Sequence, residues 1–294
     1  MILIQKFILK ILNILIPFNS IGDSIYINLR YIISNQKIFK GGEETFNDKL
    51  TKRMLSSLYL KPEYQITSCK YTVKEYLTQK GLHNHTVPTI GLIENILELE
   101  KFKFPDRCVV KSTAGSGQII LKKNEDIEIN KKNVSKWFKG NHYNNTREKN
   151  YKTLVNKIIV EPFIFDKDEI LDYKMFFSNG VLTATQVDVD RHSGHKRNFY
   201  DPNWKKLDFS LKHKSTDKEI KVPKLYTRMI DAGKIIAKDF DFVRVDFYTN
   251  NKEFYIGEIT HIPESGLGKT IPKRYEEKMS LTLWGATNSK NMPD

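Results

Sequence analysis

The chain has 294 residues, 39% hydrophobic and 12% aromatic, which allows up to three domains of roughly 100–200 residues and excludes wholesale disorder. A formal net charge of +13 indicates an acidic partner such as nucleotide phosphates, an anionic polymer or a membrane surface, unless it reflects only a heavy use of lysine. Cys69 and Cys108 are too few for a disulfide framework and lack metal-ligand spacing, so a reducing cytosol is the simplest compartment.

The first eighteen residues are rich in isoleucine and leucine, but Lys6 and Lys10 interrupt them. The stretch is too short and too charged to span a membrane, which takes about 20 apolar residues, and it lacks the small-residue cleavage site of a signal peptide. Lys6, Lys10 and Asn13 share one narrow helical face, and the remaining surface is apolar. Such a helix is usually part of the core, and the alternative is a helix that lies on a membrane surface.

The middle of the chain carries helix and hairpin signals. Residues 41–50 are polar and turn-rich and separate the N-terminal helices from the rest of the chain. A helix is expected over 71–81, with Gly81 as its stop. Two strands, 107–111 and 118–122, flank a loop of small residues and form a hairpin.

The second half of the chain predicts more antiparallel pairs. Ser178-Asn179-Gly180 is a hairpin turn signal between strands at 173–177 and 181–190. Apolar residues recur at helical spacing over 224–240, and strands follow at 242–248 and 253–260. Antiparallel strand pairs mixed with helices indicate an α+β fold.

Three groups of polar residues could carry chemistry. Lys111 and the small-residue loop 112–117 could bring a cation and backbone amides to phosphate oxygens, although glycine hairpins are common and the loop is not a P-loop. Arg244 and Asp246 project from the same face of one strand, and Glu258 lies on the next strand. If the register places Asp246 opposite Glu258, a divalent cation would relieve their repulsion; the alternative is a structural ion pair.

The third group follows the strand that ends at Asp188 and Asp190. Arg191 and the basic loop 192–197 come next, with two histidines but no further metal ligand. A solvated loop is the default interpretation here, and anion binding is the second.

In order and spacing, these pieces resemble the TupA-like ATP-grasp family, named for teichuronopeptide synthesis. The resemblance runs from about residue 44 to beyond Pro272. It is carried by short motifs in series: Lys70 with Val73-Lys74-Glu75-Tyr76; Val109-Val110-Lys111 with the Gly-Ser-Gly loop; Glu161-Pro162-Phe163; Asp172-Tyr173-Lys174; Asp190-Arg191; Tyr200-Asp201 with Trp204; Val243-Arg244-Val245-Asp246; and Gly257-Glu258-Ile259-Thr260.

The resemblance implies roles for individual residues. The nucleotide would be held by two phosphate lysines, the small-residue loop, the hinge beside adenine and a loosely matched ribose contact: Lys70, Lys111, Ser112, Gly115, Ser116, Gly117, Glu161, Pro162, Phe163, and Glu169 or Asp166. Mg²⁺ would be held by Asp246, Glu258 and Thr260. Catalysis would fall to Lys174, Arg191 and Arg244, with Arg244 stabilising an acyl phosphate.

The sequence departs from the wider ATP-grasp pattern at two positions. Cys69 stands where many members carry Asp before the first phosphate lysine, and Thr260 stands where they carry Asn as a metal ligand. Threonine is the weaker ligand, so a second metal ion is in doubt.

The resemblance also implies an architecture and a reaction. An N-terminal helical and small α/β part (1–100) would precede two α+β subdomains that clasp ATP, at 101–165 and 166–294. An ADP-forming carboxylate–amine ligase would join an amino acid to a uronic acid of a capsular or O-antigen saccharide. The site of action would be the cytoplasm, with peripheral association at the inner membrane face.

The main alternative is a glycosyltransferase-like polysaccharide enzyme that uses a nucleotide-sugar. A nucleic-acid partner is not expected, because the sequence shows neither a helix-turn-helix nor an aromatic and basic stripe.

Overall fold

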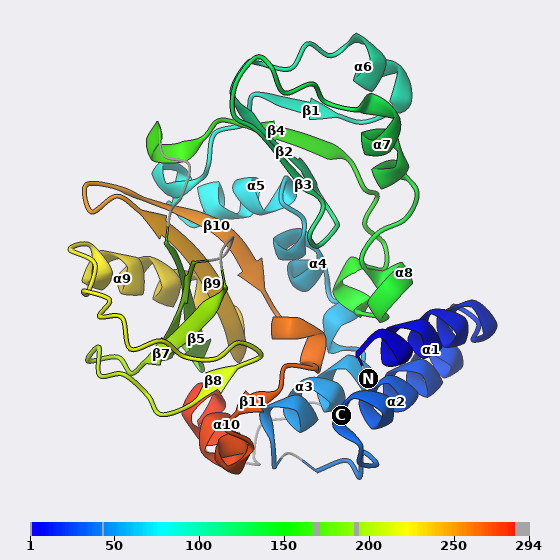
Figure 1. Cartoon of the computed structure of the whole chain (residues 1–294), viewed down its shortest axis with the longest axis vertical. Helices are drawn as coiled ribbons and strands as arrows, with labels where there is room; N and C mark the ends of the chain where they lie inside the picture. Colours follow the sequence, from blue (N-terminus) through cyan, green and yellow to red (C-terminus); the bar gives the residue numbers. More distant parts are fainter. Residues whose placement is uncertain (1, 43, 167–170, 191–193, 286–294) are drawn as a thin grey trace. The chain divides into compact units, whose positions relative to one another are not determined.

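The computed structural model describes residues 2–42, 44–166, 171–190 and 194–285 (Figure 1). The chain divides into two compact units, and neither is continuous in sequence. Unit 1 is Met1–Lys40 with Thr51–Ile170, and unit 2 is Gly41–Leu50 with Leu171–Asp294. The sequence predicted three parts, 1–100, 101–165 and 166–294. These parts do not coincide with the two units, and that division stays a prediction.

Unit 1 is built on a four-stranded antiparallel sheet of order β1-β4-β2-β3. Its strands are β1 (Gly91–Ile93), β2 (Cys108–Ser112), β3 (Ile119–Lys122) and β4 (Ile158–Glu161). Its helices are α1 (Ile2–Leu15), α2 (Ser20–Asn35), α4 (Pro62–Ser68), α5 (Thr72–Gln79), α6 (Ile96–Lys101), α7 (Lys131–Ser135) and α8 (Tyr143–Thr146). The hairpin predicted at 107–122 and the helix predicted at 71–81 are confirmed.

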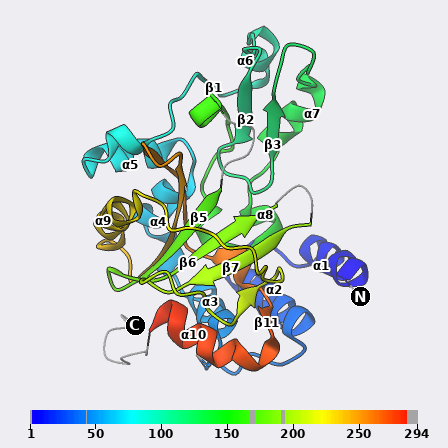
Figure 2. The ribbon, with the colours of Figure 1, turned by 60° about the vertical axis from the view of Figure 1, so that its left-hand side comes forward.

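The two faces of this sheet differ because successive strand residues point to opposite sides. Cys108, Val110, Ile158 and Val160 are fully buried in a core completed by Leu99 of α6 and Val134 of α7. Both helices lie beside the sheet in Figure 2. Lys111 and Glu161 occupy the alternate positions of β2 and β4, so they lie on the opposite face.

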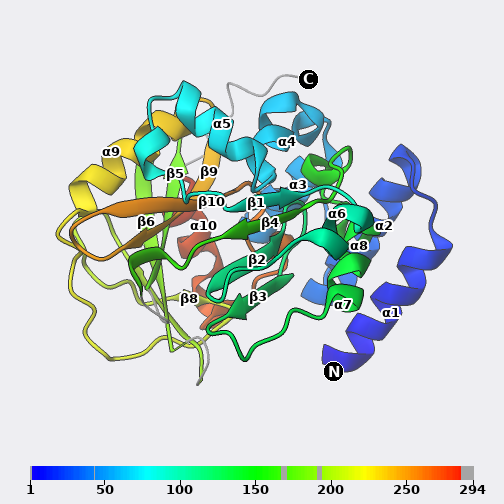
Figure 3. The same ribbon diagram turned by 90° about the horizontal axis from the view of Figure 1, so that it is seen from above.

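Helices α1 and α2 lie side by side (Figures 1 and 3). Of the residues in α1 whose burial is described, none is buried, and Ile4, Phe7, Ile11 and Ile14 are exposed. The expectation that this helix belongs to the core is therefore wrong. The sequence pattern shows how apolar a helix is, but it does not show whether anything covers it.

The segment expected to separate the N-terminal helices from the rest contains the start of a helix, α3 (Phe46–Leu55). Thr45 and Asp48 cap its first turn reciprocally: the Thr45 amide donates to Asp48 Oδ2 at 2.9 Å, and the Asp48 amide donates to Thr45 Oγ1 at 3.2 Å. Phe46 and Leu50 are buried. Because of this cap, the polar residues begin a packed helix and not a linker.

Unit 2 is built on a five-stranded antiparallel sheet of order β10-β9-β5-β6-β7. The strands are β5 (Asp172–Ser178), β6 (Val181–Val189), β7 (Lys196–Tyr200), β9 (Phe242–Thr249) and β10 (Phe254–Thr260); a small sheet pairs β8 (Ser210–Leu211) with β11 (Thr270–Ile271). Asn179 and Gly180 have φ of 49° and 77°, the positive values that a tight hairpin turn needs. The predicted β5–β6 hairpin and β9–β10 pair are confirmed.

One face of this sheet packs against α9 (Tyr226–Ala237). Gly233 permits the close approach, because a Cβ there would lie 2.2 Å from the Phe177 ring. The opposite face is apolar at one end, where α10 (Glu276–Trp284) stacks Trp284 on Phe242 with ring centroids 3.9 Å apart. The other end of that face carries buried charges. Both units mix helices with antiparallel sheets, which confirms the α+β prediction.

Candidate active site

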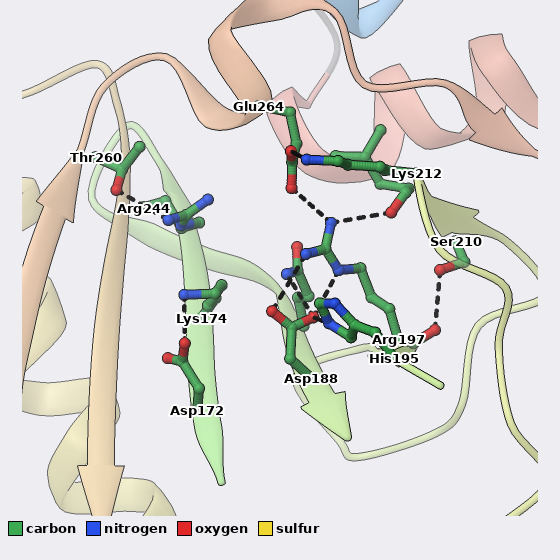
Figure 4. Close-up of polar contacts among 12 residues, drawn as sticks. Asp172, Lys174, Asp188, His195, Arg197, Ser210, Lys212, Arg244, Thr260 and Glu264 are labelled. Carbon is green, nitrogen blue, oxygen red and sulfur yellow. Dashed lines mark hydrogen bonds and ion pairs between the residues drawn. The ribbon is translucent and has the colours of Figure 1, made fainter. Parts of the chain in front are cut away.

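The charged end of the unit 2 sheet joins residues of three adjacent strands. Lys174 of β5 contacts Asp246 of β9, its direct cross-strand partner, and lies 2.6 Å from Asp172 Oδ2. Arg244 donates to Asp246 through Nε at 2.7 Å and through a terminal nitrogen at 2.9 Å, and donates to Thr260 Oγ1 at 3.0 Å. Figure 4 shows Lys174 with Asp172, and Arg244 with Thr260.

These groups stay charged although they are buried. Burial opposes the charge on Lys174, but Asp172 and Asp246 outweigh it and raise the pKa of the lysine. Burial also opposes ionisation of Asp246, but Arg244 and Lys174 outweigh it and lower the pKa of that carboxyl. The group therefore presents fixed charges at neutral pH, as a site that stabilises developing charge requires.

The register of the β9–β10 hairpin places Asp246 opposite Glu258. Ile256 pairs with Phe247, so an unbroken ladder would have set Glu258 against Val245. The register shifts between Ile256 and Glu258, which leaves Gly257 as the extra residue of a bulge. A Cβ at Gly257 would lie 2.2 Å from the Tyr248 ring. This bulge turns Glu258 to the face that carries Asp246, and it fulfils the register condition stated from the sequence.

Asp246, Glu258 and Thr260 are hard oxygen donors, which suit Mg²⁺. Among the described residues, no three His, Cys, Asp or Glu side chains cluster as a metal cage would require. Two carboxylates still fit an ion that is otherwise held by water and phosphate oxygens, the usual way in which Mg²⁺ is bound. Asp246 already accepts hydrogen bonds from Arg244 and Lys174, so a bound ion would replace one of these bonds.

A second buried network adjoins this group on β6 and β7. Arg197 donates to Asp188 Oδ1 at 2.6 Å and Oδ2 at 3.2 Å, to Glu264 Oε1 at 2.7 Å and to the Leu211 carbonyl at 2.9 Å (Figure 4). Lys212 donates to the other oxygen of Glu264 at 2.7 Å. The expected solvated loop over 192–197 is therefore wrong from Lys196 onward, because Arg197 belongs to β7 and is buried.

In unit 1, Glu161 of β4 binds two lysines. Lys111 of β2 contacts Glu161 Oε2 at 2.7 Å, and Lys74 of α5 contacts Oε1 at 2.6 Å. Burial opposes ionisation of Glu161, but the two lysines outweigh it and lower the pKa of the carboxyl. For Lys74 the balance is opposite: burial outweighs Glu161 and lowers the pKa of the lysine.

Lys74 and Lys111 differ in how many hydrogen bonds they can still make. The Lys74 ammonium also donates to the Val87 carbonyl and to Thr89 Oγ1, both at 2.7 Å, so all three of its donors are used. The one hydrogen bond that the Lys111 ammonium makes to the described residues is the bond to Glu161. Lys111 therefore has donors left for a ligand, whereas Lys74 positions Glu161. Lys74 belongs to one of the motifs that carry the family resemblance, but the sequence did not predict a role for it.

The loop between β2 and β3 is anchored at its start and exposed at its tip. Asn156 Oδ1 accepts from Ser112 Oγ at 2.7 Å and from the Ala114 amide at 3.0 Å. Lys70 Nζ donates to the Gly115 carbonyl at 2.9 Å. Ser116 and Gly117 are exposed. The sequence missed Asn156, since a lone asparagine about 40 residues away carries no local signal.

The remaining predicted residues have mixed outcomes. Pro162 and Phe163 directly follow β4 and are half-buried, and the Arg107 guanidinium lies 4.7 Å from the centre of the Phe163 ring. Glu169 and Arg191 lie outside the described residues, as does the side chain of Asp166. The assignment of all these residues to a nucleotide or metal stays a prediction.

Comparison with known proteins gives one family. A family model described as TupA-like ATPgrasp matches residues 48–282. No curated protein matches the chain.

Similar solved structures include three ligases. An L-amino acid ligase from Bacillus licheniformis is 12% identical with a TM-score of 0.47, over 94% of this chain and 65% of that one. D-alanine–D-alanine ligases from Bacillus anthracis and Helicobacter pylori are each 17% identical, with TM-scores of 0.43 and 0.41, over 75% and 74% of this chain and 64% and 56% of theirs. The match spans less than two thirds of the length of each.

Proposed function

Since the chain belongs to the TupA-like ATP-grasp family, we propose that it is an ATP-dependent carboxylate–amine ligase that releases ADP. The observation that carries the proposal is the group on β5, β9 and β10. A protonated lysine and an arginine lie there beside Asp246, which is paired across the strands with Glu258. Phosphoryl transfer depends mainly on positioning and charge stabilisation, which such a group supplies.

Lys111 and Lys70 are the proposed phosphate-binding cations. Lys111 has unused donors, and Lys70 holds the glycine loop through Gly115. The exposed residues Ser116 and Gly117 let backbone amides approach phosphate oxygens. Glu161, Pro162 and Phe163 would form the hinge beside adenine. Because Glu161 already binds Lys111, a triphosphate would share that lysine with it.

The reaction has two steps. A carboxylate oxygen attacks the terminal phosphorus of ATP, the bond to the bridging oxygen breaks, and ADP leaves an acyl phosphate behind. An amine then attacks the acyl carbon, phosphate leaves and a proton is released, which gives the amide. Lys174 holds its positive charge near the transferred group, and Arg244 stabilises the negative charge that develops at the reacting carboxyl. Asp246 and Glu258 would hold Mg²⁺, which neutralises phosphate charge when bound.

The proposed substrates are an acidic saccharide, carried on lipid at the cytoplasmic face of the membrane, and an amino acid. The net charge of +13 suits an anionic polymer and its carrier. The resemblance to enzymes that decorate acidic surface polysaccharides points to the same substrate class.

The test has two parts. Mg-ATP should raise the melting temperature by binding the folded state, whereas UDP-sugars should not. Incubation with ATP, a uronic acid and a panel of amino acids should then yield ADP and phosphate together with an amide. AMP with pyrophosphate would refute the acyl-phosphate route, and stabilisation by a UDP-sugar alone would favour a glycosyltransferase.

A further inference from the structure

Helix α1 exposes a continuous apolar strip. Its exposed apolar residues are spaced three or four apart along the helix: Ile4, Phe7, Ile8, Ile11, Ile14 and Leu15. With 3.6 residues per turn, these six positions fall within an arc of about 120°. Phe18, Ile21 and Ile25, in the link and the first turns of α2, are exposed as well. Contiguous apolar surface of this kind marks a place where something binds.

The strip is presented by the fold and is not part of a loose end. Arg147, which is fully buried, donates to the carbonyls of Ile16 and Pro17 just after α1, both at 2.9 Å, and to Asn13 Oδ1 at 3.1 Å. It is paired with Asp23 of α2 at 3.0 Å. One arginine thus satisfies carbonyls at the end of α1 and fixes both helices to unit 1.

The charges of residues 1–42 are almost all positive. This part of the chain contains four lysines (Lys6, Lys10, Lys37 and Lys40), a buried arginine (Arg30) and a single acidic residue, Asp23. Asp23 is buried against Arg147, so it does not offset the exposed charge. Lys10 is exposed and lies one turn from both Phe7 and Ile14, at the edge of the strip. Long lysine side chains at such an edge place their apolar stems on the strip and their ammonium groups outside it.

We infer that α1 docks on an anionic lipid bilayer and lies in the plane of its headgroups. An apolar strip flanked by lysines suits that surface. No helix among the described residues is long and apolar enough to cross a membrane. A symmetric contact with a second copy would bring the lysines of one helix toward those of the other, which like-charge repulsion disfavours. The inference depends on residues 1–40 and not on the ligase reaction.

The test uses the full chain and sedimentation with vesicles of phosphatidylcholine, with and without phosphatidylglycerol. The variant Phe7→Glu with Ile14→Glu places charge on two side chains that are 65% and 74% exposed. The matched control, Leu97→Glu with Val155→Glu, changes two side chains of the same unit that are each 74% exposed. Both variants lower the net charge equally, so a difference between them reports on the strip and not on overall charge.

The wild type should sediment with the anionic vesicles, less in high salt, and only weakly with phosphatidylcholine alone. The strip variant should lose at least about tenfold in partitioning, because each buried apolar side chain contributes about that factor. The control should stay within about twofold, and both should keep the wild-type melting temperature. A solvatochromic label on Phe7→Cys should shift to the blue with vesicles, and one on Leu97→Cys should not.

Three outcomes would overturn the inference: no sedimentation of the wild type, an equal loss in both variants, or a wild-type dimer that the strip variant converts to a monomer while vesicles stay unbound. The last outcome would assign the strip to a second copy. Turnover of ATP in solution should be unchanged in the strip variant, so a failure here is distinguishable from a failure of the proposed reaction.

Discussion

The two units each hold a group of charged side chains that are buried or half-buried, and the groups differ in the sign that is in excess. In unit 1, Lys74 and Lys111 share Glu161. In unit 2, Asp172, Asp246 and Glu258 outnumber Lys174 and Arg244. A surplus of ammonium groups favours phosphate, whereas a surplus of carboxylates favours a divalent cation. The same kinds of charged side chain therefore suit different ions in the two units, according to which sign is in excess.

The largest effect should come from breaking the carboxylate surplus of unit 2. Glu258→Gln keeps the shape of the side chain and removes its charge, so it should fold normally, bind Mg-ATP poorly and lose about a hundred- to a thousand-fold in turnover. ADP release in the presence of both substrates measures this loss.

The exposed Glu253→Gln, on the turn of the same hairpin, is the control and should behave as wild type. Wild-type turnover in Glu258→Gln would leave Asp246 and Arg244 as a structural ion pair.

A second test concerns the pH down to which a half-buried carboxylate of unit 2, that of Glu264, stays ionised. Burial opposes ionisation of Glu264, but Arg197 and Lys212 outweigh it and hold its pKa at about 2, below the ordinary 4.5. A lowered folded-state pKa contributes stability above pH 4.5 that is lost as the pH falls toward 2, at most roughly 3 kcal/mol.

Urea unfolding at pH 6, 4.5 and 3 should show this loss in the wild type and a smaller slope in Glu264→Gln. The variant should also be less stable at pH 6, because Arg197 loses a charged partner. Parallel curves for the two proteins would contradict the assignment.

A third test changes the position of Glu258 by a substitution at the neighbouring bulge residue, Gly257, and leaves Glu258 itself unchanged. Gly257→Ala places a methyl group against the Tyr248 ring, so we expect a destabilisation of about 1–3 kcal/mol and weaker binding of Mg-ATP. Adding Tyr248→Ala removes the obstructing ring and should restore part of both. Thermal melting with and without Mg-ATP measures the two effects. If Gly257→Ala matched the wild type in both, the bulge would not need glycine.

The smallest effect separates the two lysines of unit 1. Lys111→Met should raise the KM for ATP about tenfold, since a ligand contact is lost, and should also lower stability, because the buried Glu161 loses one of its two charged partners. Lys74→Met should lower stability by about 1–3 kcal/mol and change KM less, because its three hydrogen bonds are all internal. A larger rise in KM for Lys74→Met than for Lys111→Met would mean that Lys74 binds the nucleotide and Lys111 positions Glu161.

Features with a local cause could be predicted from the sequence. The β5–β6 hairpin follows from Ser178-Asn179-Gly180, and α9 follows from its helical spacing. The pairing of Asp246 with Glu258 could be stated only as a condition, because the turn does not fix the register of the hairpin. The bulge leaves two traces in the sequence. The buried residues of β10 change their spacing from two to three between Ile256 and Ile259, and Gly257 stands between them, where its small size matters only once Tyr248 is beside it.

Features that depend on distant partners could not be predicted. Arg197 lies in a run of histidines and basic residues that is typical of a loop, and its place in β7 depends on Asp188 and Glu264. The exposure of α1 depends on what packs against it, which helical spacing does not record. Lys74 gained its role from Val87, Thr89 and Glu161, which are distant from it in sequence.

The way in which the chain passes between the units limits how the protein can be dissected. Residues 41–50 belong to unit 2 although residues 1–40 and 51–170 belong to unit 1. Phe46 lies 5.6 Å from the Phe242 ring and 5.9 Å from the Trp284 ring, and Asn47 donates to the Gly268 carbonyl at 2.9 Å. A recombinant fragment that starts at residue 171 would lack Phe46, which packs against Phe242 and Trp284. A peptide of residues 41–50 would therefore have to be added to the fragment to complete the core of unit 2.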